Sequence, residues 1–152
     1  MKAKRITLDV LIATLAAFFA YIATVKIGKF EEFRLAIGAQ PLAHSLKAIL
    51  VYAVPASLII PVLLLIIPKY RVIGLLTAIG VLLTFCGYII LIQLNFYGMI
   101  PCSCAGISHA WSWMQQLYFN LLLISVCTVS LLLIRNINNL NERENKLKYS
   151  SL

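Results

Sequence analysis

The sequence predicts an all-α integral membrane protein, a four-helix bundle with a short interfacial helix between its first and second spans. Composition is the first reason: of 152 residues, 62% are hydrophobic and 12% are charged, whereas soluble domains have roughly half and a quarter. The mean hydropathy of +0.94 agrees with this class. The apolar residues also gather in four runs, each close to the about 17 to 25 residues that a bilayer crossing requires.

We place these runs in a single membrane domain of residues 1–152, with spans at about 8–25, 48–67, 72–96 and 113–134. The first span holds one ionisable residue, Asp9, which lies near its start and is expected to be solvated. The opening residues also fit a signal peptide, because basic residues precede an apolar core that ends in alanines.

The second and third spans contain residues with special backbone properties. Pro55 and Pro61 lie in the second span, and membrane helices accept proline where neighbouring groups satisfy the freed carbonyls. The third span contains small residues that permit close helix packing, which are Gly74, Gly80 and Gly87.

The segment between the first two spans, residues 26–47, mixes charged and turn-forming residues with apolar ones. A short amphipathic helix lying along the membrane surface would account for this mixture. Its apolar side chains would be those of Phe30, Phe33, Leu35 and Ile37.

The basic residues indicate the orientation. With a cytoplasmic N-terminus, nine Lys and Arg residues lie inside and four lie outside, in agreement with the positive-inside rule. Both termini, including a polar tail over 135–152, are then cytoplasmic, and the loop between spans three and four faces the periplasm of a bacterial inner membrane. The basic residues behind the formal charge of +8 are scattered around the apolar runs and form no long patch interleaved with aromatics, so we expect no nucleic-acid partner.

Cys102 and Cys104 lie in this outer loop, within the stretch IPCSCAGISHAWSW. An oxidising compartment allows paired thiols to form and exchange disulfides. A bond between residues two apart needs a sharp turn, and strain in such a bond makes it easier to reduce. Pro101 before the pair and Gly106 after it provide suitable dihedral angles. We therefore predict that the two cysteines are the reactive residues.

Further residues are predicted to support the pair. Ser103 separates the cysteines, and His109 either accepts a proton or is an ordinary interfacial residue. The free N–H groups at the start of span four would favour a nearby thiolate. Trp113 belongs to an aromatic cluster expected at the membrane surface. Several amides at the outer ends of spans three and four can hydrogen-bond across helices, namely Gln93, Asn95, Gln115, Gln116 and Asn120.

Two other interpretations of the cysteine pair stay open. The pair can form a purely structural disulfide that fixes the loop, or it can bind a soft ion such as Cu(I). Zinc usually takes four ligands, and His109 supplies only a third. We predict no cofactor and no resident metal. Cys86 and Cys127 lie within spans three and four and are interpreted as small packing residues.

The cysteine segment also carries a family resemblance. The sequence IPCSCAGISHAWSWMQQLYFN resembles the "VPCSCGG" motif and following "W..HL.FN" pattern of the MauE family, which belongs to the DoxX-like redox-associated membrane proteins. The stretches KFEEFRLAIGAQPL, VPASLIIPVLLLIIPKYRVIGL and TFCGYIILIQLNFYG are similar to the family's outer segment and its second and third helices. The resemblance covers roughly residues 20–132.

This resemblance implies a four-helix membrane bundle with a redox-associated role. The best-known member of the family assists production of the disulfide-rich small subunit of methylamine dehydrogenase. The motif positions carried over to this chain are Pro101, Cys102, Ser103, Cys104, Gly106, Trp113, Leu117, Phe119 and Asn120. The chain departs from the family where relatives often have an acid in helix two and a histidine in the last helix, because it has Leu58 and Gln116 there; Ala105 replaces a glycine.

The sequence therefore predicts a membrane accessory protein. Its outward-facing pair, Cys102 and Cys104, would exchange thiols and disulfides with a periplasmic client or redox partner during that partner's maturation. Two alternatives belong to other classes: a non-catalytic subunit of a larger envelope complex, or a small metal or solute handler. The sequence contains no HExxH, phosphate-binding glycine loop or serine elbow, which are the motifs of several common enzyme classes.

Overall fold

The structure, a computed structural model, describes residues 2–96 and 112–150. Within these residues it contains only helices and no strand. The elements are α1 (Lys2–Gly28), α2 (Phe30–Gly38), α3 (His44–Ile66), the short 3-10 helix η1 (Pro68–Tyr70), α4 (Arg71–Gln93) and α5 (Trp113–Ser150).

Four of the helical segments are long and apolar enough to cross a membrane, and α2 lies between the first and second of them. The segments are Lys2–Gly28, His44–Ile66, Pro68–Gln93 and Trp113–Arg143. This confirms the predicted all-α class with four apolar helices and a short helix between the first two.

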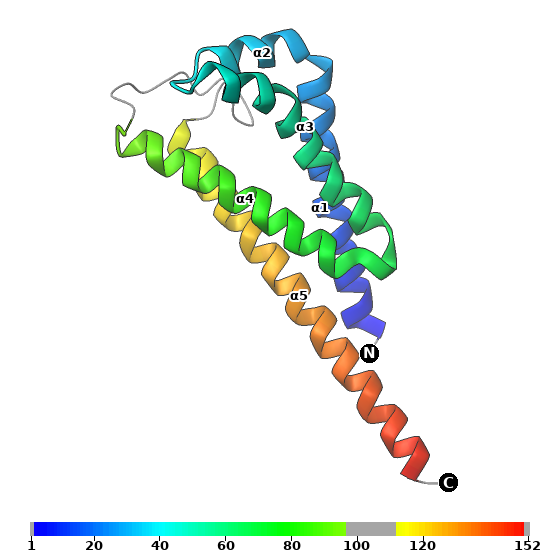
Figure 1. Cartoon of the computed structure of the whole chain (residues 1–152). Coiled ribbons are helices and arrows are strands. Elements are labelled where there is room, and N and C mark those ends of the chain that lie inside the picture. The colour runs from blue at the N-terminus through cyan, green and yellow to red at the C-terminus, as the bar shows by residue number, and fades with distance from the viewer. Residues whose placement is uncertain (1, 97–111, 151–152) are drawn as a thin grey trace.

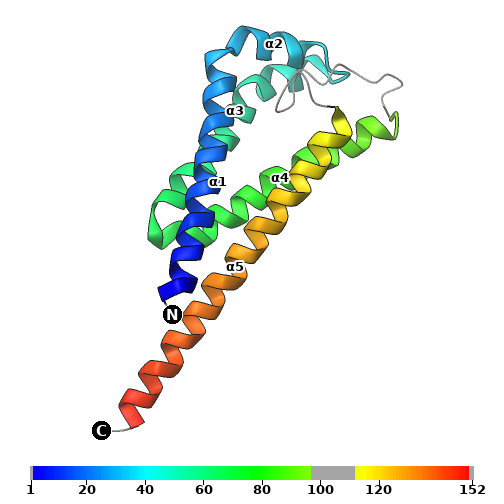
Figure 2. The same ribbon diagram turned by 180° about the vertical axis from the view of Figure 1, so that it is seen from behind.

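The helices form two pairs that are joined at one end of the molecule. Helix α1 packs along α3, α4 packs along α5, and η1 connects α3 to α4 at the end where the N-terminus lies (Figure 1). Helices α3 and α4 separate as they run from η1 toward α2, as the view from behind also shows (Figure 2). The molecule therefore has a narrow end at η1 and a wide end at α2.

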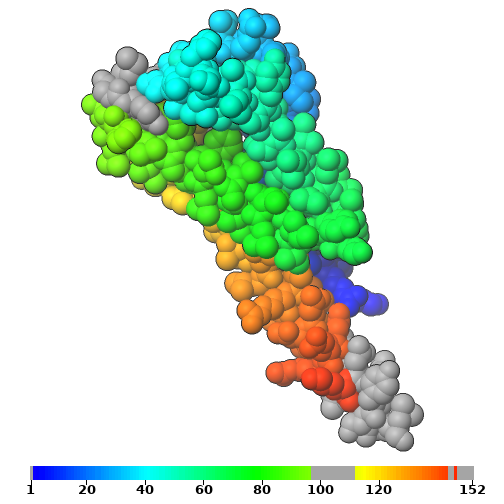
Figure 3. Space-filling view, viewed as in Figure 1, coloured from blue at the N-terminus to red at the C-terminus, as the bar shows by residue number. Residues whose placement is uncertain are grey.

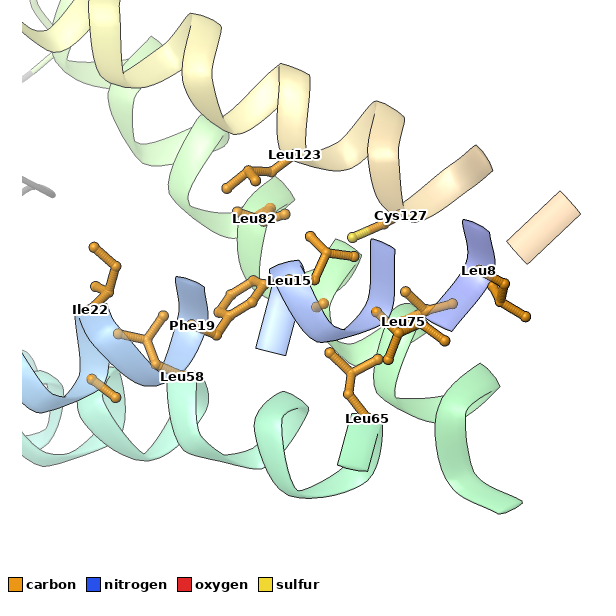
Figure 4. Close-up of a cluster of buried hydrophobic side chains, with 13 residues drawn as sticks. Leu8, Leu15, Phe19, Ile22, Leu58, Leu65, Leu75, Leu82, Leu123 and Cys127 are labelled. Carbon is orange, nitrogen blue, oxygen red and sulfur yellow. The ribbon is translucent and has the colours of Figure 1, made fainter. Parts of the chain in front are cut away.

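The main core lies between the four long helices. Its residues are apolar and lie at helical spacing, so that each helix turns one stripe inward. Figure 4 shows this cluster, which includes Leu8, Leu15, Phe19 and Ile22 of α1, Leu58 and Leu65 of α3, Leu75 and Leu82 of α4, and Leu123 and Cys127 of α5. Helix α2 is held separately, because Phe33 and Ile37 are buried against Val51 of α3.

Glycine permits a close helix crossing at one of the three predicted positions. A Cβ atom on Gly74 would lie 3.0 Å from the backbone nitrogen of Leu65 and 3.1 Å from the carbonyl carbon of Leu64. Gly80 and Gly87 have no such neighbour within 4 Å. The narrow end of the α3–α4 hairpin therefore depends on Gly74 alone among these three residues.

Several helix ends differ from the predicted spans. Helix α1 (Lys2–Gly28) extends beyond the predicted 8–25 at both ends, and α3 begins at His44, four residues before the predicted limit at 48. Helix α4 ends at Gln93, three residues before the predicted limit at 96, and Asn95 has a φ of 52° in the turn that follows. Asparagine is one of the few residues that adopt this left-handed conformation readily. At the other terminus, the polar tail that begins at residue 135 continues α5 as a helix to Ser150.

Candidate functional site

Most of the predicted reactive segment lies outside the described residues. This applies to Pro101, Cys102, Ser103, Cys104, Gly106 and His109, so their predicted roles remain predictions. Trp113 and Asn120 are described, and they lie on the first turns of α5, directly after this segment.

Helix α5 begins with a reciprocal cap. The Ser112 backbone N–H donates to the Gln115 side-chain oxygen at 2.9 Å, and the Gln115 N–H donates to the Ser112 hydroxyl at 3.3 Å. This is the capping-box arrangement, which satisfies two backbone donors at a helix start. It sets the first turn of α5 and with it the position of Trp113. Gln115 was predicted to bond across helices, and its carbonyl oxygen instead caps its own helix.

Trp113 is buried at the wide end of the bundle. Its side chain packs with Ile89 and Ile92 of α4, and its ring meets that of Tyr88 edge-on, with centroids 6.3 Å apart. Two other aromatics of the predicted surface cluster, Phe96 and Tyr118, are exposed. Trp113 is therefore part of an inter-helix contact, whereas Phe96 and Tyr118 are exposed on the bundle, and their location at the membrane surface remains a prediction.

Gln116 and Asn120 are buried amides on the inner face of α5. Their side chains are only 2% and 5% exposed, and a spacing of four residues places them one above the other on the helix. The Asn120 side chain is a hydrogen-bond partner of the Cys86 thiol on α4. The predicted bonding of an amide across spans three and four is thus present at Asn120, whereas Gln93 and Asn95 are exposed.

These amides line a cavity of about 470 Å³ in the wide half of the bundle. Its walls come from α1, α2, α3, α4 and α5, and most of the lining side chains are apolar. The aromatic side chains are those of Phe18, Phe19, Phe33, Phe85, Tyr88 and Trp113. The polar ones are those of Lys26, Gln40, Ser57, Thr84, Tyr88, Gln116 and Asn120.

Two positions at which the chain departs from the pattern that the resemblance implies lie in this cavity. The resemblance implies an acid at the position of Leu58 and a histidine at the position of Gln116. The side chains of Leu58 and Gln116 both line the cavity, one from α3 and the other from α5. In this chain the two positions therefore present an apolar and a neutral amide group to the same space.

A buried polar contact that the sequence analysis missed crosses the cavity wall. The Tyr88 hydroxyl of α4 donates to Gln40 Oε1 at 2.6 Å, and Gln40 Nε2 donates to the Ala36 carbonyl at 3.2 Å. Gln40 is 2% exposed and lies in the connection between α2 and α3. Gln40 lies between Ala39 and Pro41, in a stretch without the regular spacing of apolar residues that marks the buried face of a helix. The local sequence therefore does not indicate that this amide is buried.

One cationic side chain lines the cavity among the described residues. Lys26 lies near the end of α1, and its ammonium group is 4.8 Å from the centre of the Phe33 ring. A cation placed over an aromatic face is attracted by the ring quadrupole. Lys26 thereby links α1 to α2 at the wide end of the bundle.

The narrow end is basic and held by polar contacts. Arg71 at the start of α4 donates to Asp9 of α1 at 2.8 Å, so the exposed Asp9 carboxylate is ion-paired. Lys4 and Arg5 of α1 donate to Asn136 and Asn141 of α5 at 3.3 and 3.1 Å. These contacts bring the basic start of α1 beside the polar part of α5.

Within residues 2–96 and 112–150, no group of three His, Cys, Asp or Glu side chains is placed to hold a metal ion. Cys86 and Cys127 are free thiols in this part of the chain, and both are buried between helices. Cys127 belongs to the main apolar core, in agreement with the packing role predicted for it.

The four apolar spans and the amide-lined cavity between them define a multi-pass membrane protein of the helical-bundle class. The family model for methylamine utilisation protein MauE matches residues 4–133. The chain therefore belongs to the MauE family, which confirms the resemblance seen in the sequence. No curated protein and no solved structure matches the chain.

Proposed function

We propose that the chain is a redox accessory of the bacterial inner membrane, in which Cys102 and Cys104 exchange thiols and disulfides with a periplasmic client during its maturation. The observation that carries this proposal is the family match, which spans the CSC pair and associates the chain with methylamine utilisation. Paired thiols are stable as a disulfide in the periplasm and would be reduced in the cytosol.

Chain connectivity supports an outward position for the pair. The pair lies in the segment that joins α4 to α5. The end of α4 and the start of α5, which flank this segment, lie at the wide end of the bundle (Figure 1). The basic end is the opposite one, and it is the end expected in the cytoplasm.

The proposed exchange proceeds through a mixed disulfide. A thiolate of the client attacks one sulfur of the Cys102–Cys104 disulfide and releases the other as a thiolate. A second client thiolate then attacks the mixed disulfide, which leaves the client oxidised and both cysteines of the chain reduced. Two electrons pass from client to chain, and two thiol protons accompany them. Because each step is reversible, the same pair can also reduce a client.

A trapping experiment tests this function. In a chain with Cys86→Ala and Cys127→Ala, the further change Cys104→Ala leaves Cys102 alone and removes the resolving thiol. We expect a DTT-sensitive adduct with a client on a non-reducing gel of membranes from cells producing this variant. The reciprocal Cys102→Ala variant tests which sulfur is attacked, and the chain with both Cys102→Ala and Cys104→Ala is the control that must give no adduct.

The absence of an adduct from both single-cysteine variants would contradict exchange. If these variants instead unfolded at lower temperature than the parent, the pair would be a structural disulfide, and the non-catalytic assembly role would replace the proposal. Protection of the pair from alkylation by added Cu(I) would favour the metal-handling role.

A further inference from the structure

The cavity is open toward the lipid between α3 and α4. These helices touch at Gly74 near η1 and separate toward α2, and a hollow lies between them below α2 in the space-filling view (Figure 3). Ala53 of α3 and Thr84 of α4 both line the cavity and are exposed, so the cavity reaches the molecular surface at these two helices. Since this outer surface belongs to two predicted spans, the opening faces the bilayer, and a ligand would enter from the lipid phase.

The chemistry of the walls narrows the class of ligand. The volume of about 470 Å³ falls in the range of roughly 300 to 1,000 Å³ typical of small-molecule sites. Apolar and aromatic side chains predominate, and the buried polar groups on α5 are the neutral amides of Gln116 and Asn120. An amide group has two donors and one acceptor, so one bond to Cys86 leaves Asn120 able to bond a ligand.

These features favour a flat, uncharged, membrane-dissolved molecule with carbonyl oxygens over a fatty acid or a phospholipid chain. The acyl chain of a lipid has no group that could hydrogen-bond to the buried amides. The carboxylate of a fatty acid would need a cationic partner in the cavity. The Lys26 ammonium is the cation that lines the cavity among the described residues, and it lies on α1 beside the Phe33 ring, whereas both buried amides are on α5. Isoprenoid quinones combine a dicarbonyl ring with an apolar tail that can extend between α3 and α4 into the lipid.

We propose that this cavity binds the head group of an isoprenoid quinone, which accepts electrons from reduced Cys102 and Cys104. The inference rests on the proposed exchange function and gives it a direction, from client to membrane. Asn120 follows Trp113 by seven residues, which is about 10 Å along a helix. The bound ring would therefore lie only about two helical turns below the start of α5, close in sequence to the cysteine segment.

The redox step is balanced. The two thiols become one disulfide and release two electrons and two protons. The quinone takes up both electrons and both protons and becomes the quinol, which leaves through the opening between α3 and α4. Each turnover would restore the disulfide that oxidises the next client.

Trp113 provides a reporter for binding. In the full-length protein with Trp111→Phe, purified in detergent, Trp113 is the one tryptophan that remains, and it lines the cavity. We expect a short-chain ubiquinone to quench its fluorescence with a saturable dependence on concentration. Val81→Phe places a larger side chain in the cavity and should weaken binding about tenfold. Asn120→Leu removes the amide with little change in volume and should also weaken it about tenfold.

The matched control is Leu83→Phe, on the same helix but 54% exposed and outside the cavity. This variant should bind like the parent, and circular dichroism should show equal helix content in all variants. Quenching that rises linearly without saturation, or that is equal in all variants, would overturn the proposal. The quinone proposal would also be overturned if oleate displaced the quinone and the affinity for oleate were unaffected by Asn120→Leu. That result would identify the cavity as an acyl-chain site.

The binding and exchange proposals can fail separately. Quinone should still bind when Cys102 and Cys104 are both changed to Ser, because the cavity is built from other residues. In the parent protein, added quinone should convert the two reduced thiols to a disulfide with formation of one quinol. Binding without thiol oxidation would overturn the electron-transfer part, whereas loss of the client adduct with quinone binding intact would reject the exchange function alone.

Discussion

The Tyr88–Gln40 hydrogen bond joins helix α4 to the connection between α2 and α3 across the cavity wall. Because Gln40 is only 2% exposed, the loss of this bond leaves a buried acceptor unsatisfied. Measured interhelical hydrogen bonds in membrane proteins are nevertheless modest. We therefore predict that Tyr88→Phe lowers the free energy of unfolding by about 1 kcal/mol, measured by denaturation in mixed detergent micelles.

A double-mutant cycle isolates this pair from the other contacts of both residues. Tyr88→Phe combined with Gln40→Leu should be less destabilising than the sum of the single changes. Tyr118→Phe is the matched control, since Tyr118 is 65% exposed on α5. Strict additivity of the two changes would show that the bond contributes nothing to stability.

At the residue scale, the sequence predicted that amides at the outer ends of spans three and four bond across helices, but it did not predict which of these amides are buried. Gln116 and Asn120 share one face of a regular helix, and the apolar stripe around them indicates which way that face points. Gln40 does not belong to a regular helix, and its position depends on how the chain turns between α2 and α3. The cavity arises because α3 and α4 separate toward the wide end, and no local sequence pattern predicts that separation.

At the element scale, the packing of the α3–α4 hairpin depends on the missing side chain of Gly74. A methyl group there would meet backbone atoms of Leu64 and Leu65, which cannot move aside as a side-chain tip can. We predict that Gly74→Ala lowers the free energy of unfolding by about 1 to 3 kcal/mol through overpacking. The thermal unfolding midpoint of the purified protein in detergent measures the effect.

Gly80 and Gly87 supply matched controls on the same helix, because a Cβ atom at either position meets no atom within 4 Å. Alanine is the better helix former by about 0.5 to 1 kcal/mol, so Gly80→Ala and Gly87→Ala should leave stability unchanged or raise it slightly. A loss of stability in all three variants would refute the close-crossing explanation.

The existence of the spanning helices can be predicted from composition, but the residues at which they end cannot. Long apolar runs predict spans because unsatisfied backbone groups are excluded from lipid. The end of α4 at Gln93 depends on the left-handed conformation of Asn95, which is a property of one residue in one turn. The helical extension of α5 past residue 135 is supported by bonds from Lys4 and Arg5 to Asn136 and Asn141. Such distant partners are not visible in a local reading of the sequence.

At the scale of the whole molecule, the bundle has two chemically different ends. The narrow end gathers the start of α1, η1, the first residue of α4 and the polar part of α5, which together carry nine of the thirteen Lys and Arg residues (Figure 1). The wide end carries α2, the amide-lined cavity and the helix ends that flank the cysteine segment. The division agrees with a cytoplasmic narrow end, since membrane insertion retains basic loops inside.

A cytoplasmic position of the narrow end predicts the outcome of a labelling experiment in intact cells. In a Cys86→Ala and Cys127→Ala background, Cys102 and Cys104 should react with a membrane-impermeant maleimide after treatment with an impermeant phosphine reductant. A second chain lacks all four native cysteines and carries Asn138→Cys, at an exposed position of α5. It should be labelled only after the membrane is permeabilised. The reverse pattern would place the narrow end outside, which contradicts periplasmic exchange because the cysteine pair would then face the reducing cytosol.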